Sequence, residues 1–531
     1  MSEAELENVS EPTSGRRQRE SASAGQGDAQ TRTPTEAGSE PEPVPTGVVG
    51  LDEVLGGGLT PGRLYLLEGY PGTGKTTLAL EFLLEGVRRG EPVLYVTLSE
   101  TAEELRAAAT SHGWSLDGIR IRELIPSEES LHPDAQYTVF HPSEVELGET
   151  TRAIFEEAEK LRPTRTVFDS LSELRLLAGS ALRYRRQVMS LKQFFARCQC
   201  TALMLDDRSG GDDDRQLRSL ASGIMLLEQV HPEYGAERRR MVVVKHRASQ
   251  YRGGYHDFAI RRGGVKVFPR VVAADERHGS SRALLSSGVD RLDTLLGGGL
   301  ERGTSTLIAG AAGTGKSTIA LQHATAAAAR GERASLFLFD ESPTTLVTRA
   351  RGLGIPVEEH IEAGRLVLRQ VDPAELSPGE FASTVLAEGR QPGQSIIVID
   401  SLNGYLNAMP EERFLVTQLH ELLTSLGQLG IATILVGVQH GLIGSTLDNP
   451  VDASYLADTV VQLRYFEVDG AVRQAISVIK KRAGRHERTI RELRLQSSGI
   501  WLGDPLREYR GILTGVPVLN ARDPESRLPE P

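Results

Sequence analysis

Cysteine is nearly absent from this chain of 531 residues, which contains only Cys198 and Cys200. A structural zinc site needs about four ligands close together, so this pair indicates two reduced thiols near a strand rather than a metal centre. Long apolar runs are absent too, because the longest stretches, such as residues 431–438, are too short to span a bilayer. No segment resembles a signal peptide. We therefore expect a cytoplasmic protein that makes no membrane contact.

Positive charge is also in short supply. The net charge is −11, so the chain has no general field that would attract nucleic acid or an anionic membrane. Lysine is rarer still, since only eight of the 60 basic residues are lysines. Four of these eight stand at matching places in the two halves of the chain: Lys75, Lys316, Lys245 and Lys480. A chain that otherwise uses arginine thus places compact point charges where they would suit a phosphate group.

Those lysines belong to a long internal repeat. Residues 47–59 return as 288–300, and Glu100 returns as Glu341, at one constant offset along the chain. The offset changes only between motifs, as loop insertions in a duplicated domain would produce. Residues 1–43 contain scarcely any large apolar side chains and cannot bury enough surface to fold. We expect a disordered tail at 1–43, a first domain at 44–270, a linker at 271–283, a second domain at 284–518 and a polar tail at 519–531.

Each half alternates between strand-like and helix-like segments. In the first half a strand at 64–67 is followed by a helix at 78–89, a strand at 93–98 and a helix at 102–112. Continuously apolar strands, such as residues 396–399, are typical of parallel sheets covered on both faces. The sequence therefore predicts two tandem α/β domains with doubly wound, mostly parallel sheets.

A glycine-rich motif, G-x-x-G-x-G-K-[S/T], occurs in both halves, at residues 69–76 and 310–317. Each copy follows an apolar strand-like run and opens a helix-like run, as a P-loop requires. The glycines let backbone N–H groups converge on a phosphate at a helix N-terminus. The lysine would neutralise the β- and γ-phosphates, and the final hydroxyl would bind Mg²⁺. The pattern predicts ATP with Mg²⁺, bound by Gly72, Thr73, Gly74, Lys75, Thr76 and Thr77 in the first half and by Gly313, Thr314, Gly315, Lys316, Ser317 and Thr318 in the second.

Acidic residues follow apolar strands at equivalent places in both halves. Asp169 and Asp400 are in the usual position of the carboxylate that holds Mg²⁺ in a P-loop site, beside Thr76 and Ser317. Earlier in each half, Glu100 and the pair Asp340 and Glu341 end the strand after the P-loop helix. A carboxylate there can orient and deprotonate an attacking water, so these three are the candidate catalytic residues; the alternative is a solvated acid at a strand end.

A Lys-x-Arg pattern ends an apolar strand late in each half. Lys245 and Arg247 follow residues 241–244, and Lys480 and Arg482 follow residues 476–479. Alternate residues of a strand share one side, so each pair of cations points the same way. Such a strand could reach the γ-phosphate bound by a neighbouring subunit, and we count these four among the ATP-binding residues; the alternative is a charged strand end in solvent.

With these elements in order, the chain resembles the KaiC family, clock-protein ATPases of the RecA-like class, from about residue 46 to 518. The resemblance rests on the P-loops and on residues 95–101, 338–342, 458–459, 465–467, 480–492 and 507–515. It implies tandem RecA-like P-loop NTPase domains that form a homohexamer, with ATP bound between subunits. It further implies slow ATP hydrolysis by the first domain, autophosphorylation by the second, and signalling through protein partners.

The resemblance also assigns roles residue by residue. The family's adjacent catalytic glutamates fall on Ser99 and Glu100 in the first half and on Asp340 and Glu341 in the second. The first glutamate is thus lost in one half and shortened in the other. The family's phosphorylated Ser-Thr pair falls on Ser454 and Tyr455, which makes Ser454, and with it Tyr455, the phosphorylation candidates. The family's adenine-side tryptophan falls on Leu353.

Two other functions remain open at this point. A RecA-like DNA motor would grip DNA through the loop that begins at Asp206, but five carboxylates cluster within residues 206–214 and would repel a phosphate backbone. DNA is therefore not an expected partner. A nucleotide-gated scaffold with little catalysis is the third possibility, because Ser99 and Asp340 depart from the family's glutamates. ATP turnover without DNA would argue against the scaffold, and salt-sensitive DNA binding would favour the motor.

Overall fold

The computed structural model describes residues 42–124, 142–208, 214–247, 249–273, 283–407, 414–438, 455–514 and 517–519. In the first half the strands are β1 (Leu64–Gly69), β2 (Val93–Thr97), β3 (Ile119–Glu123), β4 (Arg165–Asp169), β5 (Thr201–Asp207), β6 (Gly223–Val230), β7 (Arg238–His246), β8 (Tyr255–Arg261) and β9 (Gly264–Phe268). The helices are α1 (Leu51–Val54), α2 (Lys75–Arg88), α3 (Ala102–Ser111), α4 (Pro142–Leu161), α5 (Leu171–Ala178), α6 (Ala181–Arg197) and α7 (Asp214–Leu220).

The second half repeats this order. Its large sheet contains β12 (Ser305–Gly310), β13 (Arg333–Leu338), β14 (Leu366–Gln370), β15 (Gln394–Asp400), β16 (Ala432–Val438), β17 (Thr459–Val468), β18 (Ala471–Lys481), β19 (Arg491–Gln496) and β20 (Gly499–Pro505). Two short antiparallel two-stranded sheets pair β10 (Leu284–Leu285) with β11 (Leu300–Glu301), and β21 (Tyr509–Arg510) with β22 (Val518–Leu519). The helices are α8 (Asp290–Leu295), α9 (Lys316–Ala329), α10 (Pro343–Gly352), α11 (Glu358–Glu362), α12 (Pro378–Gly389), α13 (Leu402–Asn407) and α14 (Leu415–Gln428).

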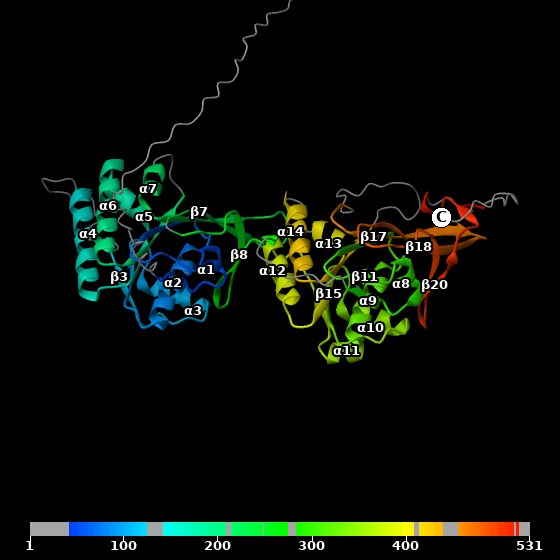
Figure 1. Ribbon diagram of the computed structural model, residues 1–531. Helices are drawn as coiled ribbons and strands as arrows, with labels where there is room; N and C mark the ends of the chain where they lie inside the picture. Colours follow the sequence, from blue (N-terminus) through cyan, green and yellow to red (C-terminus); the bar gives the residue numbers. More distant parts are fainter. Residues whose placement is uncertain are drawn as a thin grey trace, which may run out of the picture. The chain divides into compact units, whose positions relative to one another are not determined.

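Both halves build a nine-stranded sheet with the same strand order (Figure 1). The first sheet runs β3-β2-β4-β5-β1-β6-β7-β8-β9, and the second runs β14-β13-β15-β16-β12-β17-β18-β19-β20. The six strands from β3 to β6 are parallel, and β7 to β9 continue the sheet with antiparallel pairing. The prediction of two tandem, doubly wound and mostly parallel RecA-like domains is confirmed.

The central strands are buried on both faces, as their continuous apolar sequences predict. In β1, Tyr65 and Leu67 pack with α2 and α3 on one face, while Leu64 and Leu66 pack with α4, α5 and α6 on the other. Figure 1 shows the two groups of helices on opposite sides of the first sheet. The predicted helix at 78–89 begins earlier, at Lys75, because the P-loop turns directly into it at Gly74. The expected tails and linker lie almost wholly outside the described residues.

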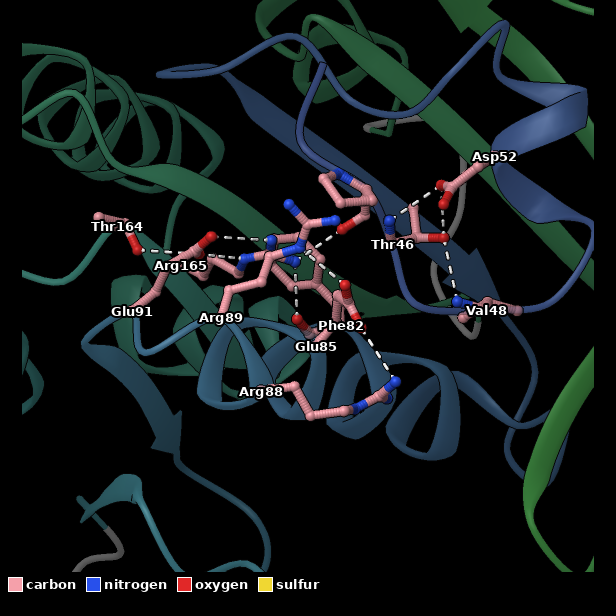
Figure 2. Close-up of polar contacts among 11 residues, drawn as sticks. Thr46, Val48, Asp52, Phe82, Glu85, Arg88, Arg89, Glu91, Thr164 and Arg165 are labelled. Carbon is pink, nitrogen blue, oxygen red and sulfur yellow. Dashed lines mark hydrogen bonds and ion pairs between the residues drawn. The ribbon is translucent and has the colours of Figure 1, made fainter. Parts of the chain in front are cut away.

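A buried arginine anchors the start of the first domain (Figure 2). Arg165, at the first position of β4, has no exposed surface. Its guanidinium donates hydrogen bonds to Glu91 Oε2 at 2.6 Å, to the carbonyl of Pro45 at 2.6 Å and to that of Phe82 at 3.1 Å. Arg165 comes four residues before Asp169, and the residue four positions before Asp400 in the second half is Ile396. The buried cation is therefore a feature of the first domain, where it ties the entering chain to α2 and β4.

A second buried charge, Glu81, lies on α2 beneath β9. Glu81 is 6% exposed and accepts hydrogen bonds from the Val265 N–H at 3.3 Å. A Cβ on Gly264 would come within 1.8 Å of Glu81 Oε1, so the strand can cross the carboxyl group only with a glycine there. Burial raises the pKa of Glu81 from 4.5 to about 8. The folded domain therefore holds a proton that the unfolded chain gives up.

We expect Glu81→Gln to stabilise the first domain at alkaline pH. Because the pKa of Glu81 is raised on folding, its contribution to stability is lost as pH rises from about 4.5 to about 8. Glutamine keeps the acceptor for Val265 and does not titrate. The free energy of unfolding should match that of the parent below pH 4.5 and exceed it at pH 8 by on the order of 4 kcal/mol. Calorimetry across this range measures the effect, with Glu103→Gln at an exposed position of α3 as control. Parallel pH curves for parent and variant would contradict the prediction.

Candidate nucleotide-binding sites

Each P-loop lies at the carboxyl end of the central strand of its sheet, between β1 and α2 and between β12 and α9. Gly74 and Gly315 are the N-cap residues, with φ of 99° and 97°, in the left-handed region that glycine tolerates. A Cβ on Gly74 would also lie 2.4 Å from the Ile260 side chain. No side chain caps either helix among the described residues, so the N–H groups of both first turns face the loop and suit a phosphate.

The first P-loop lysine is held inside its own loop. Lys75 Nζ donates to the carbonyls of Gly69 at 2.9 Å and Tyr70 at 3.0 Å. It also forms an ion pair with Asp207 Oδ1 at 2.7 Å, where β5 ends beside β1. Lys75 is 7% exposed. The lysine that the P-loop motif assigns to the β- and γ-phosphates is thus paired with the Asp207 carboxylate.

Beside this lysine, Asp169 meets the P-loop hydroxyl. Thr76 Oγ1 donates to Asp169 Oδ2 at 3.3 Å, and Tyr95 Oη donates to the same oxygen at 2.6 Å. Burial raises the pKa of Asp169, and the hydrogen bond from Tyr95 and the charge of Lys75 oppose the rise. A hydroxyl next to a carboxylate offers oxygen ligands of the kind that Mg²⁺ prefers, so these residues fit the metal.

Glu100 lies in the turn that follows β2. The turn is fixed by Thr97, whose hydroxyl donates to the Glu100 carbonyl at 2.7 Å and accepts from its N–H at 3.0 Å. Burial raises the pKa of Glu100, the charge of Asp169 adds to the rise, and Lys75 opposes it. Glu100 therefore lies close enough to interact electrostatically with Asp169, the candidate Mg²⁺ ligand, and with the P-loop residue Lys75. The preceding residue, Ser99, is exposed.

The second site has the same plan with different partners. Lys316 Nζ donates to the Ala311 carbonyl at 2.7 Å, and burial lowers its pKa against the opposing charge of Asp400. Burial raises the pKa of Asp400, and a hydrogen bond from Ser317 and the charge of Arg349 oppose the rise. Ser317 and Asp400 thus repeat the hydroxyl and carboxylate pair of the first site.

The two adjacent acids of the second half engage separate groups. Asp340 accepts a hydrogen bond from Ser401 Oγ. Glu341 forms an ion pair with Arg349 at 2.7 Å. The same arginine donates to Thr318 Oγ1 at 2.7 Å. These contacts place Asp340 toward the end of β15 and Glu341 toward the P-loop helix.

A cavity of about 540 Å³ opens over the second P-loop, within the usual range of ligand pockets. Leu353, at the position of the family's adenine-side tryptophan, lines it together with Leu495. The lining residues are Gly313, Gly315, Lys316, Ser317, Thr318, Glu341, Arg349, Gly352, Leu353 and Leu495. A cavity that combines P-loop residues with apolar side chains suits a nucleotide.

The Lys-x-Arg pair of the first half lies away from its own P-loop. Lys245 pairs with Ile224 across β7 and β6, and Ile224 pairs with Leu66 of β1. The P-loop leaves β1 at Gly69, about 10 Å further along the strand. Lys245 therefore lies toward the amino edge of the parallel sheet, where its Nζ donates to the Arg218 carbonyl at 2.8 Å.

The second half repeats this arrangement. Lys480 pairs with Val460, which pairs with Leu307 of β12, whereas the P-loop leaves that strand at Gly310. Lys480 Nζ donates to the Ala457 carbonyl at 2.8 Å. In both halves the structure does not bring the Lys-x-Arg pair together with the P-loop of the same domain.

The arginines of both pairs are exposed, and one of them contacts Tyr455. Arg247 and Arg482 follow the lysines at the same edges of the sheets. Arg482 Nη2 donates to the carbonyl of Tyr455 at 2.8 Å. The Tyr455 side chain is 55% exposed, and Ser454 lies outside the described residues.

Sequence reasoning missed three residues of these sites: Asp207, Tyr95 and Arg349. Asp207 was interpreted only as part of an acidic cluster that repels DNA, and its contact with Lys75 depends on β5 lying beside β1. A usable signal existed for Arg349, because the repeat places Ala108 at the equivalent position of the first half. Tyr95 carried no signal beyond an apolar strand pattern.

A P-loop at the end of a central parallel strand, with a hydroxyl beside a strand-end aspartate and present twice, defines a tandem P-loop protein with RecA-like domains. A model of the KaiC ATPase family matches the chain twice, over residues 44–272 and 285–506. The chain belongs to this family of ATPases.

Several similar proteins are named for circadian clocks. The circadian clock protein KaiC3 of Synechocystis sp. is 27% identical over 491 residues, which is 91% of this chain and 96% of that protein. The circadian clock oscillator protein KaiC of Picosynechococcus sp. is 29% identical over 495 residues, 91% of this chain and 94% of that protein. The KaiC of Thermosynechococcus vestitus is 28% identical over 495 residues, 91% and 93% of the two chains. In the part of the chain that the structure describes, no helix has the length and apolarity needed to cross a membrane.

Proposed function

We propose that this KaiC-family ATPase works as a homohexameric ring, in which both the first and the second domains hold Mg-ATP between neighbouring subunits. The observation that carries the proposal is the placement of two sets of phosphate-binding groups at opposite edges of each sheet. The P-loop lies at the carboxyl edge, and the Lys-x-Arg pair lies toward the amino edge. A head-to-tail contact would bring the Lys-x-Arg pair of one subunit onto the P-loop of the next, and such contacts close into rings.

Within each site the residues divide the work of hydrolysis. Lys75 and Lys316 neutralise the β- and γ-phosphates, and the paired hydroxyl and carboxylate, Thr76 with Asp169 and Ser317 with Asp400, hold Mg²⁺. The ion supplies positive charge against the phosphates when bound. Glu100 in the first domain orients and deprotonates the attacking water. Asp207 pairs with Lys75 and holds its ammonium group at the P-loop.

In the second domain we propose autophosphorylation of Ser454. Asp340 or Glu341 accepts the proton of the Ser454 hydroxyl, and the serine oxygen forms a new bond to the γ-phosphorus of ATP. The bond from that phosphorus to the β–γ bridging oxygen breaks, and ADP leaves. Support comes from Arg482, a member of the phosphate-binding pair, whose guanidinium contacts the backbone of Tyr455 next to Ser454. Tyr455 itself is the second candidate for modification.

We further propose domain boundaries at 44–270 and 284–518, a cytoplasmic location and output through protein partners. The net charge of −11 supports protein partners over DNA, because it gives no general field that attracts a phosphate backbone. The names of the relatives suggest a clock role for those proteins.

One incubation tests hydrolysis and phosphorylation together. The full chain is incubated with Mg-ATP and no nucleic acid, beside Lys316→Ala, and both ADP release and phosphopeptides are followed by mass spectrometry. We expect ADP release from the parent, and phosphate on Ser454 in the parent but not in Lys316→Ala. ADP release without any phosphate on Ser454 or Tyr455 would leave a ring ATPase and overturn the autokinase. No ADP release would overturn the proposed activity as a whole.

A further inference from the structure

One arginine in the second nucleotide site has no counterpart in the first. Arg349 lies near the end of α10, and its guanidinium grips Glu341 with two parallel contacts, Nη2 to Oε2 at 2.7 Å and Nε to Oε1 at 3.2 Å. Its remaining nitrogen, Nη1, donates to Thr318 Oγ1 at 2.7 Å. Such a fork positions a planar cation firmly, which a lysine could not do at this place.

The position of the guanidinium within the cavity is informative. Thr318 is in the first turn of α9, and the backbone of a P-loop cradles the α- and β-phosphates there. Arg349 lines the cavity together with Lys316, Ser317 and Thr318. Through its contact with Thr318 it lies beside the turn at which the α-phosphate would bind. Its side chain is 30% exposed, so a ligand can reach it.

The charged groups around the cavity explain why a cation such as Arg349 suits this position. Three carboxylates lie near the second P-loop, those of Asp340, Glu341 and Asp400. Among the described residues, the cations that face them are Lys316 and Arg349. Arg349 lies near enough to Asp400 to oppose the rise of its pKa. A polyphosphate entering this site would meet three carboxylates, and Arg349 adds a second cation of the same chain beside the lysine.

The first site lacks this cation. Arg349 comes eight residues after Glu341, and the residue eight positions after Glu100 is Ala108. Both segments begin alike, because Thr101 caps α3 and Ser342 caps α10 through their side chains. The two helices are therefore in the same register, and the difference is confined to the side chain.

We propose that Arg349 is a nucleotide-binding residue of the second site, which takes the α-phosphate of ATP or ADP. The inference rests on the proposed function of that site. The guanidinium contacts Glu341 and Thr318, and a bound nucleotide would draw it onto the phosphate and free Glu341. The second site should accordingly bind both ADP and ATP more tightly than the first, because the α-phosphate is common to both nucleotides.

The test measures the affinity of the second site in the full chain, with Lys75→Ala disabling the first site. Arg349→Ala should weaken the binding of ADP and ATP by about 10- to 100-fold, the usual worth of a hydrogen bond to a charged group. Binding of adenosine, which carries no phosphate, should not change. Arg349→Lys should recover part of the loss. Arg351→Ala serves as the matched control, because Arg351 is on the same helix but pairs with Glu358 outside the cavity lining.

The outcomes separate this inference from the proposed function. If Lys316→Ala abolishes ADP binding and Arg349→Ala leaves it unchanged, the site exists and the inference about Arg349 is wrong. If adenosine binding falls as much as ADP binding in Arg349→Ala, the arginine acts only on the fold of the pocket, and the inference is again wrong. If Lys316→Ala itself has no effect on ADP binding, the second nucleotide site fails as a whole.

Discussion

Replacing Lys480 and Arg482 with alanine should slow ATP turnover by the second domain on the order of 10³-fold, the usual effect of removing a finger that stabilises the charge of the reacting phosphate. Both side chains lie toward the amino edge of the sheet, whereas the P-loop of the same domain lies at the carboxyl edge. The P-loop of the variant is intact, so ADP affinity should stay within a few-fold of the parent.

The measurement is steady-state ATP turnover in a Lys75→Ala background, so that the second site alone is observed. Arg330→Ala is the control, because Arg330 pairs with Glu332 at the end of α9 remote from the P-loop. The account would be contradicted by a decrease of less than tenfold. It would also be contradicted if ADP affinity fell in parallel with turnover, since that result would indicate damage to the P-loop itself.

Arg165→Leu should destabilise the first domain by about 3–5 kcal/mol, because removing one partner of a buried ion pair leaves the others uncompensated. The change removes the donor to Glu91 and to the carbonyls of Pro45 and Phe82 (Figure 2). It also removes a guanidinium that lies 4.9 Å from the centre of the Phe82 ring.

Denaturant unfolding of the full chain, followed at the transition of the first domain, measures this loss. The control is Arg120→Leu, because Arg120 pairs with Glu157 at 2.7 Å but its side chain is 58% exposed. An exposed ion pair contributes about 1 kcal/mol or less. Equal effects of the two substitutions would show that burial does not decide the strength of the Arg165 network.

The sequence was sufficient to predict the fold, and it named the P-loop hydroxyls that the structure places beside the strand-end aspartates. The P-loops could be recognised because their chemistry depends on consecutive residues, and the strand-end acids because the repeat showed them twice. Asp207 could not be assigned in this way, since its contact with Lys75 depends on the order of strands in the sheet. The same holds for Arg165, whose partners come from three separate segments.

Arg349 is an intermediate case. The repeat shows that an arginine in the second half replaces Ala108 of the first half. The sequence does not say whether this helical residue faces solvent or the nucleotide site. Only the packing of α10 against the P-loop helix decides that this side chain enters the cavity and contacts Thr318. Departures from an internal repeat near a predicted site are therefore the positions where structure adds most to sequence.

The central claim is that each nucleotide site is completed by a neighbouring chain, and mixing of subunits tests it most directly. One protein carries Lys316→Ala, and the other carries Lys480→Ala with Arg482→Ala, both in the Lys75→Ala background. Each alone should turn over ATP at the background rate. After random mixing, about a quarter of the interfaces in a head-to-tail ring would join an intact P-loop to an intact Lys-x-Arg pair, so about a quarter of the parental turnover should return. Turnover in the mixture that stays at the level of the separate proteins would contradict completion between chains.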